Sequence, residues 1–370
     1  MTNDAPRQQT DSAERYGLPA LLTRASLARL SVVAAAMLVI VVCFAWAGGW
    51  LSTGRLDQTR MIDTFEAVNG PHPGFRRNHA KGVCLTGWFD SSGAGARLSK
   101  AVVFNPGRVP VFGRFALAGG LPMMPDGPNA VRSMALNFAL PNGEIWRTGM
   151  NDIPVFVVKD ARGFYDQLVA MKPDPNTGKP DPANVKAFLE AHPETVRAMA
   201  VIKAHPFSSG FADAAYNSLD AFSFINSAGV STPVRWSMVP VDPFTPELLY
   251  PEGQNYLFDD LIVRIHQGPA LWHLILTVGR PGDRTDDATI PWPSDREYID
   301  AGTLTVTGLE AEGAGNCRDI NFDPLVLPVG IAPSDDPLLS ARSAVYSVSF
   351  ARRAGEAKTP SAVQTGGSRT

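Results

Sequence analysis

The 370-residue sequence predicts an α+β fold, in which helices surround a closed barrel of about eight antiparallel strands and one transmembrane helix precedes the barrel. Segments that alternate apolar and polar residues recur along the chain, and Gly, Pro and Asn separate them. Helical patterns are fewer, and one long apolar run lies near the N-terminus. A closed barrel is favoured over an open sheet because closure leaves no strand edge exposed.

The apolar run extends from Leu30 to Trp50 and contains no charged residue. At about 1.5 Å per residue, a helix of this length covers the roughly 30 Å hydrocarbon layer of a bilayer. It is also longer than the core of a typical signal peptide. We therefore expect residues 30–51 to cross the inner (cytoplasmic) membrane once. The sequence "AWA" at 45–47 resembles a cleavage site, so a cleaved export signal stays open as the alternative.

Basic residues predict the orientation of this span. The four arginines that precede it are Arg7, Arg15, Arg24 and Arg29. The positive-inside rule then places the N-terminal tail, residues 1–29, in the cytoplasm, although Arg55 and Arg60 follow the run and weaken the asymmetry. We expect the rest of the chain to lie in the periplasm, or otherwise outside the cytoplasm.

After the span we expect a linker helix at 52–70, one domain at 71–355 and a disordered tail at 356–370. No break in composition divides the domain, whereas the tail is poor in apolar residues. Strands are predicted at 82–89, 101–105, 133–140, 153–158, 220–226, 232–239, 260–267 and 270–278. Helices are predicted at 163–171 and 182–204, and Pro193 interrupts the second pattern.

Composition and motifs exclude several classes of function. The formal net charge of −3 and the lack of a basic tract interleaved with aromatic residues argue against nucleic-acid binding. The cysteines Cys43, Cys84 and Cys317 have neither metal-ligand nor CxxCH spacing, and no GxGxxG, Walker A, HExxH or GxSxG motif is placed usefully. Cys84 and Cys317 can pair in an oxidising compartment, and two free buried thiols fit the sequence equally well.

The stretch "GFRRNHAKG" at 74–82 is the first candidate for chemistry. A single histidine such as His79 is more often structural than catalytic. Here, however, Arg76 and Arg77 precede it, and arginines at the start of a half-buried strand need anionic partners. Their charge also lowers the pKa of a neighbouring imidazole. A neutral histidine beside a bound anion is suited to act as a general base.

Further candidates are spread along the chain. Arg114 stands in an otherwise apolar stretch, and Asn151, which would ordinarily be a turn residue, precedes an apolar segment. If residues 337–355 are helical, Arg342 and Tyr346 lie at i and i+4 on one face. A guanidinium group stabilises a phenolate, which is a competent ligand for ferric iron. The plain alternative is a surface helix with an ordinary Arg–Tyr contact.

Six segments, in this order, resemble the haem catalases and, more closely, their short relatives, the catalase-related haem peroxidases. They read "RRNHAKG", "RFALAGG", "MNDIPVFVVKDARGF", "PDPNTGKPDPANVKAFLEAHPETVRAM", "INSAGVSTPVRWSMVP" and "FDPLVLPVGIAPSDDPLLSARSAVYSVSFARR". The resemblance covers residues 70–355. Each motif alone is moderately specific. Their collinear occurrence, with Arg–x3–Tyr–x6–Arg spacing at 342, 346 and 353, is strong.

The resemblance implies an eight-stranded antiparallel barrel and a bound haem b (iron protoporphyrin IX). It identifies His79 as the distal histidine, Asn151 as the distal asparagine and Tyr346 as the tyrosinate ligand of the iron. The residues that it places around the rest of the porphyrin are Arg342 beside the ligand, Arg76, Arg114 and Arg353 at the propionates, and Phe164 at the ring face.

Two departures from the catalase pattern favour a peroxidase. Catalases usually carry Ser, which helps orient the distal histidine, where this chain has Ala116, and they carry an apolar residue where it has Asn78. The domain is also shorter than a catalase. We expect an oxidoreductase that reduces hydrogen peroxide with electrons from an unidentified organic donor and has weak or no catalase activity. Organic hydroperoxides as further substrates and a homo-oligomer stay open.

Other functions stay open beside the peroxidase. A catalase would dismute hydrogen peroxide, and a catalase-fold enzyme that rearranges fatty-acid hydroperoxides would change residues near the distal histidine, as Asn78 and Ala116 do. A haem-binding module without turnover fits least, because storage does not need both His79 and Asn151.

Overall fold

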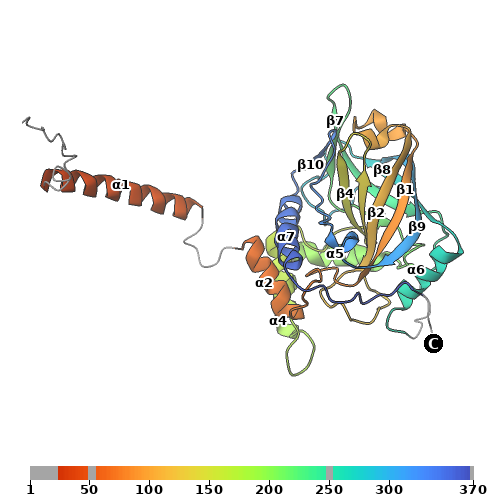
Figure 1. Ribbon diagram of the computed structural model, residues 1–370, viewed down its shortest axis with the longest axis horizontal. Helices are drawn as coiled ribbons and strands as arrows, with labels where there is room; N and C mark the ends of the chain where they lie inside the picture. Colours follow the sequence, from red (N-terminus) through yellow and green to blue (C-terminus); the bar gives the residue numbers. More distant parts are fainter. Residues whose placement is uncertain (1–23, 49–55, 247–252, 367–370) are drawn as a thin grey trace, which may run out of the picture. The chain divides into compact units, whose positions relative to one another are not determined.

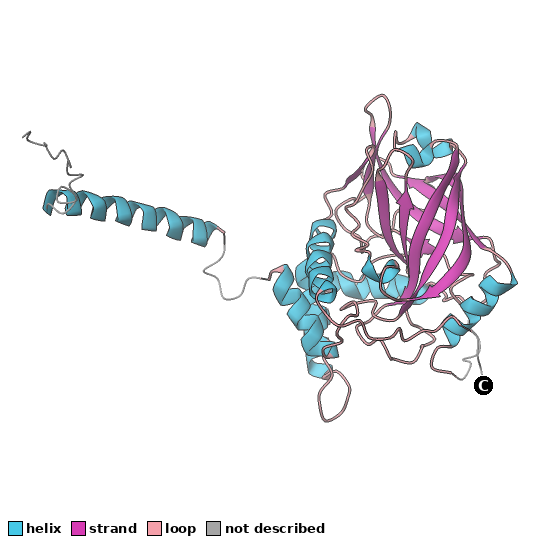
Figure 2. Ribbon diagram, viewed as in Figure 1, coloured by secondary structure: helices cyan, strands magenta, loops and turns pink. Residues whose placement is uncertain are grey.

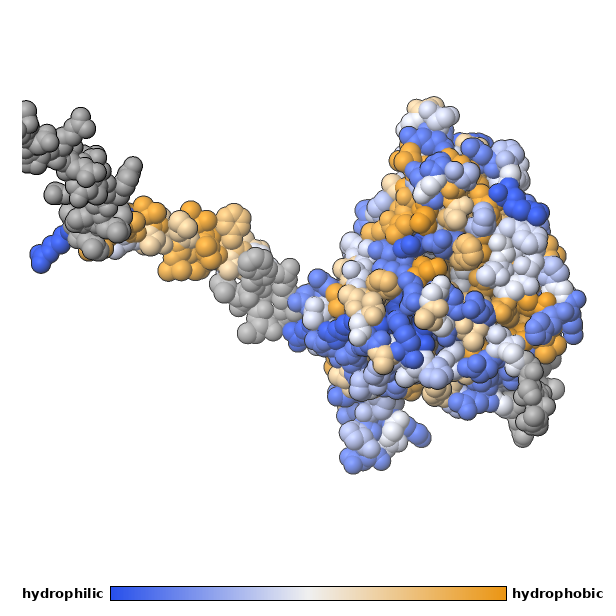
Figure 3. All heavy atoms as spheres, in the orientation of Figure 1, coloured by the Kyte–Doolittle hydropathy of each residue, from blue (hydrophilic) through white to orange (hydrophobic). Residues whose placement is uncertain are grey.

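The computed structural model describes residues 24–48, 56–246 and 253–366. The chain divides into two units, and the boundary in the sequence lies between Leu56 and Asp57. The first contains the helix α1 (Arg24–Ala47), which is apolar along most of its length (Figure 3) and long enough to cross a membrane, a property that it shares with export signals. This helix begins six residues before the expected span of 30–51. Residues 1–23 and 49–51 lie outside the described residues.

Eight antiparallel strands of the second unit form a closed barrel (Figure 1), as the sequence predicts. Their order is β7-β5-β4-β3-β2-β1-β9-β8, and β8 pairs with β7 to close the barrel. Two further strands, β6 and β10, extend the sheet beyond β7. The bounds are β1 (Gly82–Ser91), β2 (Gly107–Leu117), β3 (Arg132–Ala139), β4 (Ile145–Asn151), β5 (Tyr216–Asn217), β6 (Phe222–Ile225), β7 (Ser231–Pro240), β8 (Ala270–Val278), β9 (Glu297–Ala311) and β10 (Ile331–Pro333).

Aromatic and aliphatic side chains fill the core inside the barrel. Trp146 is fully buried, stacks on Phe138 with 4.8 Å between ring centroids, and meets Trp236 edge-on at 5.2 Å. Trp272 is also fully buried and lies 5.7 Å from Phe115. Such packing leaves the barrel without a central channel among these rings, so a large ligand has to bind outside it.

Helices cover the outside of the barrel (Figure 2). The helix α2 contacts α3 and α7, α3 contacts α4, and α6 contacts the strand β9 on another side. The bounds are α2 (Gln58–Asn69), α3 (Ala161–Ala170), α4 (Pro182–Ala191), α5 (Pro193–Ala204), α6 (Tyr256–Gln267) and α7 (Pro337–Ala354), with short 3-10 helices η2 (Ala94–Arg97), η3 (Val102–Phe104) and η4 (Cys317–Asp319). As predicted, Pro193 separates α4 from α5.

Three predicted strands are not strands. Residues 260–267 belong to α6, because Leu257, Phe258, Leu261 and Ile265 are buried at a helical spacing that the alternation of "DLIVRIHQ" concealed. Residues 102–104 form the 3-10 helix η3, and residues 153–158 are a loop of bends after β4. The sequence analysis also missed β2, β4, β5, β9 and β10, whereas β1, β3, β6, β7 and β8 lie where predicted.

The compact domain is longer than the expected 71–355. The helix α2 begins at the N-cap Asp57, whose side chain accepts a hydrogen bond from the Arg60 backbone, and it buries Met61 and Phe65. It is therefore part of the domain rather than a free linker. Residues 356–366 lack helix and strand but do not extend freely, since the side chain of Val363 is buried in the main core.

A disulfide joins Cys84 of β1 to Cys317 of η4. The two cysteines are 233 residues apart, so the bond fixes the segment after β9 against the barrel. Of the two states that the sequence left open, the structure has the paired one. Cys43, in α1, is a free and exposed cysteine.

Candidate active site

The helix α7 carries Tyr346 and two of the predicted arginines. It begins at Asp336, whose carboxylate accepts a hydrogen bond from the Leu338 backbone, and Pro337 occupies its first turn. The spacing of 3.6 residues per turn puts Arg342, Tyr346 and Arg353 on one side of the helix. The guanidinium carbon of Arg342 lies 5.9 Å from the centroid of the Tyr346 ring. The predicted pair of i and i+4 is therefore in contact.

Asp220, which the sequence analysis did not single out, holds Arg342 in place. Its carboxylate, which is 2% exposed, forms an ion pair with Arg342 Nη1, and Arg342 Nη2 donates to the Gly149 carbonyl at 3.3 Å. Burial lowers the pKa of Arg342, but the charges of Asp220 and Tyr346 outweigh it and raise this pKa well above its ordinary value. Arg342 is thus a permanent cation beside the Tyr346 phenol.

Three predicted arginines surround one buried carboxylate. Glu312 Oε1 accepts from Arg114 Nε at 2.8 Å and from Arg76 Nη1 at 3.1 Å. Burial and the charge of Arg114 lower the pKa of the third arginine, Arg353, to about 10. Among these four groups, three cations therefore face a single anion.

The arginine cluster, Arg76, Arg114 and Arg353, has hydrogen-bonding capacity that the described part of the chain does not use. Arg114 Nη2 and two guanidinium nitrogens of Arg353, Nε and Nη2, are buried without a protein partner. Two uncompensated positive charges with free donors call for an anionic ligand. A porphyrin with two propionate groups fits this requirement in charge and in donors. Tyr346 and Phe350, which are only half-buried on α7, leave a surface that such a ligand can cover.

His79, Ser133 and Asn151 form a chain of hydrogen bonds. Ser133 Oγ lies 2.9 Å from His79 Nδ1 and donates to Asn151 Oδ1 at 2.5 Å. Burial, followed by the charges of Arg114, Arg342 and Arg76, lowers the pKa of His79 to about 3. These charges act on His79 because the fold brings Arg114, Arg342 and Arg76 close to it. The imidazole is neutral over the physiological pH range, as the sequence suggested.

The backbone at His79 has a left-handed conformation, with φ of 55°, which is uncommon for a residue other than Gly. Arg114 Nη1 donates to the His79 carbonyl at 3.0 Å. Asn78 Oδ1 accepts from the His79 amide at 3.0 Å and from the Gly119 amide at 2.9 Å. Asn78, where the sequence departs from the catalase pattern, thus stabilises the turn that contains His79.

The resemblance assigns a role to Arg76 but none to Arg77, which we expected to be a surface charge. The structure instead buries Arg77. It is 8% exposed, donates to Glu66 of α2 at 2.7 Å, and pairs with Glu356 just beyond α7. Through these ion pairs, Arg77 links α2 and the end of α7 to the segment that contains His79.

Phe164 forms part of an aromatic wall. It lies near the start of α3, where the Asp160 side chain caps the helix by accepting from the Gly163 amide. Its ring stacks on Phe156, with centroids 6.0 Å apart and an angle of 15° between the planes, and it meets Phe65 of α2 at 5.7 Å. Phe156 comes from the loop after Asn151, which the sequence analysis took for a strand.

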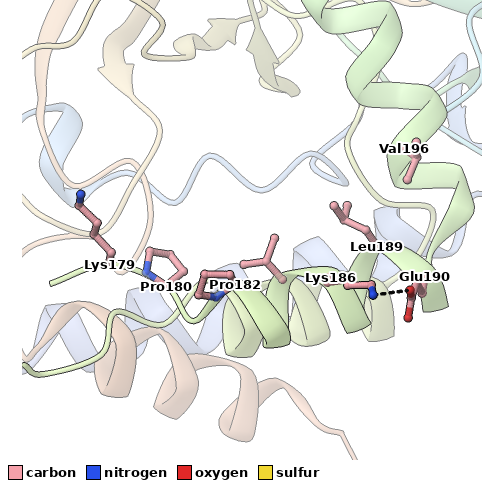
Figure 4. Close-up of a pocket in the computed structure, with 8 residues that line it drawn as sticks. Lys179, Pro180, Pro182, Lys186, Leu189, Glu190 and Val196 are labelled. Atoms are coloured by element: carbon pink, nitrogen blue, oxygen red, sulfur yellow. Dashed lines mark ion pairs between the residues drawn. The ribbon is translucent and has the colours of Figure 1, made fainter. Parts of the chain in front are cut away.

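A separate surface groove of about 710 Å³ lies along α4 and α5 (Figure 4). Its lining is largely aliphatic and includes Val185, Leu189 and Val196, beside an exposed ion pair between Lys186 and Glu190. None of the residues described above lines this groove, so it does not belong to the candidate site.

Comparisons with known proteins find relatives along most of this chain. The family model described as Catalase matches residues 54–360. The chain is 39% identical to a catalase-related peroxidase of Synechococcus elongatus over 308 residues, which cover 82% of this chain and 91% of that protein. It is 31% identical to a catalase-related peroxidase of Mycolicibacterium paratuberculosis, over 82% of this chain and 96% of that protein.

Solved structures show the same fold. A bacterial catalase superposes with a TM-score of 0.67 at 21% identity, over 82% of this chain and 63% of its own length. Catalase A from Saccharomyces cerevisiae also gives 0.67, at 19% identity, over 81% of this chain and 65% of its own length. The chain thus spans less than two thirds of the length of these two catalases. With the family match over most of its length, the chain belongs to the catalase family, whose members are haem enzymes that act on peroxide.

Proposed function

We propose that this protein is a haem b peroxidase, which reduces hydrogen peroxide with electrons from an organic donor and is held at the inner membrane by α1 with its domain in the periplasm. The observation that carries the haem proposal is the arginine cluster, whose two uncompensated charges match two propionates. The names of the two related proteins support peroxidase as the reaction. The apolar helix and the disulfide support export, because disulfides persist in oxidising compartments.

Haem b would supply the redox chemistry, with Tyr346 Oη as the protein ligand of its iron. Arg342 holds its positive charge beside this ring, with the guanidinium carbon 5.9 Å from the ring centroid. The arginine cluster would bind the propionates. Phe156 and Phe164, whose rings stack on each other, would lie against the ring face and exclude water there.

His79 and Asn151 handle the peroxide. Neutral His79 would accept the proton from one peroxide oxygen and return it to the other, which can then leave as water. The two electrons that cleavage of the O–O bond requires would come from the haem, and the organic donor would replace them. Asn151 donates a hydrogen bond from Nδ2 that holds the peroxide in line, because its Oδ1 is already bonded to Ser133.

Dismutation of hydrogen peroxide is the second candidate, and one observation favours it. The loss of the serine at Ala116 was our reason to expect poor dismutation, yet Ser133 gives His79 a hydroxyl partner. The sequence suggested that the change at Ala116 impairs His79 and Asn151, but the contact with Ser133 removes this reason. Dye oxidation and oxygen release distinguish the two candidates.

The haem assignment is tested by titrating haem into the full-length protein and recording visible spectra. We expect stoichiometric binding and a tyrosinate-ligated ferric spectrum. Tyr346→Phe changes this spectrum, whereas Tyr298→Phe, at an exposed position on β9, serves as the matched control and leaves it unchanged. Absence of binding, or an unchanged spectrum in Tyr346→Phe, would show that the assignment is wrong.

A further inference from the structure

Ser133 is a buried side chain to which neither the sequence nor the resemblance assigned a role. It is the second residue of β3 and is 7% exposed. Its hydroxyl lies between the two residues proposed to handle peroxide, 2.9 Å from His79 Nδ1 and 2.5 Å from Asn151 Oδ1. One small group thus touches both halves of the distal pair.

The protons of this chain can be assigned by counting donors. A serine hydroxyl has a single hydrogen, and the carboxamide oxygen of Asn151 can only accept. Ser133 therefore gives its hydrogen to Asn151 Oδ1 and accepts the hydrogen on His79 Nδ1. Since the imidazole is neutral, Nε2 then keeps its lone pair. The same contact turns Asn151 Nδ2 away from Ser133, where it is available as a donor.

The sheet register explains how Ser133 replaces a hydroxyl that the chain lacks elsewhere. Ser133 is the direct partner of Ala116 on β2 and of Asn151 on β4. Residues directly opposite on neighbouring strands project from the same face of a sheet. The serine that catalases usually carry at the position of Ala116 would therefore lie beside Ser133, on the same face. In this chain the hydroxyl comes from β3 instead of the neighbouring strand β2.

We propose that Ser133 is a positioning residue, which fixes the tautomer of His79 and the amide orientation of Asn151 in place of the hydroxyl missing at Ala116. The proposal rests on the proposed function for its catalytic consequence. Its structural half, the tautomer, concerns the protein alone and can be tested without haem.

The tautomer is read from nitrogen chemical shifts of the full-length, haem-free protein, produced with ¹⁵N-labelled histidine rings. The spectrum of His79→Asn identifies the His79 signals, and Asn tolerates the left-handed backbone at this position. We expect a protonated Nδ1 and an unprotonated Nε2 in the wild type at pH 7. Ser133→Ala should mix the two tautomers, and Ser133→Thr, which keeps the hydroxyl, should preserve the wild-type pattern.

The matched control is Ser237→Ala. Ser237 Oγ donates to Asn217 Oδ1 at 2.6 Å in the same sheet, which is a contact of the same kind without a histidine. We expect this change to leave the His79 signals unaltered. A second variant, Ala116→Ser combined with Ser133→Ala, puts the hydroxyl back on the neighbouring strand and should restore the wild-type pattern. It also keeps the test valid if Ser133→Ala alone folds poorly.

The haem-loaded variants test the catalytic half. Ser133→Ala should lower kcat/KM for peroxide by about 10- to 100-fold, the range for residues that orient a functional group. Ser133→Thr and the double variant should recover most of this loss. Unchanged His79 signals and peroxide kinetics within twofold of wild type in Ser133→Ala would overturn the proposal. If the protein binds no haem, the proposed function fails, while the tautomer result still decides the role of Ser133.

Discussion

Arg114 Nε lies 2.8 Å from Glu312 Oε1, and each of these two side chains is only 3% exposed. The carboxylate follows the last residue of β9, and the guanidinium projects from β2, 198 residues earlier in the chain. A single buried glutamate thus partly neutralises the three arginines of the cluster. The positive charge that remains is available to an anionic ligand.

Glu312→Gln should destabilise the haem-free protein, because it leaves the arginine cluster with no carboxylate in contact. Removal of one partner from a buried ion pair costs about 3–5 kcal/mol. Haem should then raise the melting temperature of the variant more than that of the wild type, since the propionates restore the missing negative charge. Thermal unfolding with and without haem measures both effects, with exposed Glu310→Gln as the control. A melting temperature equal to that of wild type without haem would contradict this interpretation.

Loss of the Cys84–Cys317 disulfide should destabilise the domain. Removal of a native disulfide typically costs about 2–5 kcal/mol, and a bond across 233 residues constrains a long loop of the unfolded chain. Thermal unfolding of Cys84→Ala/Cys317→Ala measures the loss, with Cys43→Ala as the control. Thiol titration of the denatured, unreduced protein should find one reactive thiol, that of Cys43. Three thiols before reduction would mean that the bond does not form.

The proposed catalytic residues could be picked out of the sequence because they stand in short motifs with a recognisable order and spacing. His79, Asn151 and Tyr346 are of this kind. Their partners were not: Ser133 meets His79 across 54 residues, and Asp220 meets Arg342 across 122. Only the sheet register and the position of α7 bring these pairs together, so no local sequence pattern predicts the contacts.

The fold was predictable where burial alternates strictly along one strand, as in β8. It was missed in β9, which contains Gly302 and Gly308, and pairs with irregular register on both sides. The helix α6 was taken for a strand because its polar residues alternate with apolar ones over one stretch. A period of two and a period of 3.6 residues cannot be distinguished over so few positions.

Arg77→Met should loosen the attachment of α2 and the chain beyond α7. It removes a largely buried cation from Glu66 and Glu356, which are about a quarter exposed. Glu66 keeps Arg352 as a partner, and Glu356 keeps the Gly74 amide. We expect a loss of about 1–3 kcal/mol, the cost of removing hydrogen bonds from partly buried charged groups. Urea unfolding measures it, with Arg108→Met as the control: Arg108 pairs with Asp90 at the surface, where such pairs contribute about 0–1 kcal/mol. Equal losses in the two variants would show that Arg77 has no special role.

His79 should make the haem-free protein less stable in mild acid. Its pKa is about 3 in the folded chain and about 6.5 in the unfolded chain, so only the unfolded chain binds the proton between these values. The free energy of unfolding therefore falls as pH decreases from 6.5 towards 3, by at most about 1.4 kcal/mol per pH unit from this group.

The comparison of wild type with His79→Asn isolates this contribution. Urea unfolding at pH 7, 6 and 5 gives the free energy of each protein, and the stability of the wild type should decline more steeply. Parallel pH dependence of the two proteins would mean that His79 protonates equally in both states, and that it is not the neutral base described here.

The most direct test of the central claim gives hydrogen peroxide to the full-length, haem-loaded protein and follows two products. One sample contains the dye ABTS as electron donor, and an oxygen electrode records gas release in a second sample without dye. The account predicts rapid oxidation of the dye with little oxygen, and His79→Asn should abolish the activity while haem stays bound. Fast oxygen release with negligible dye oxidation would contradict it and establish dismutation as the reaction instead.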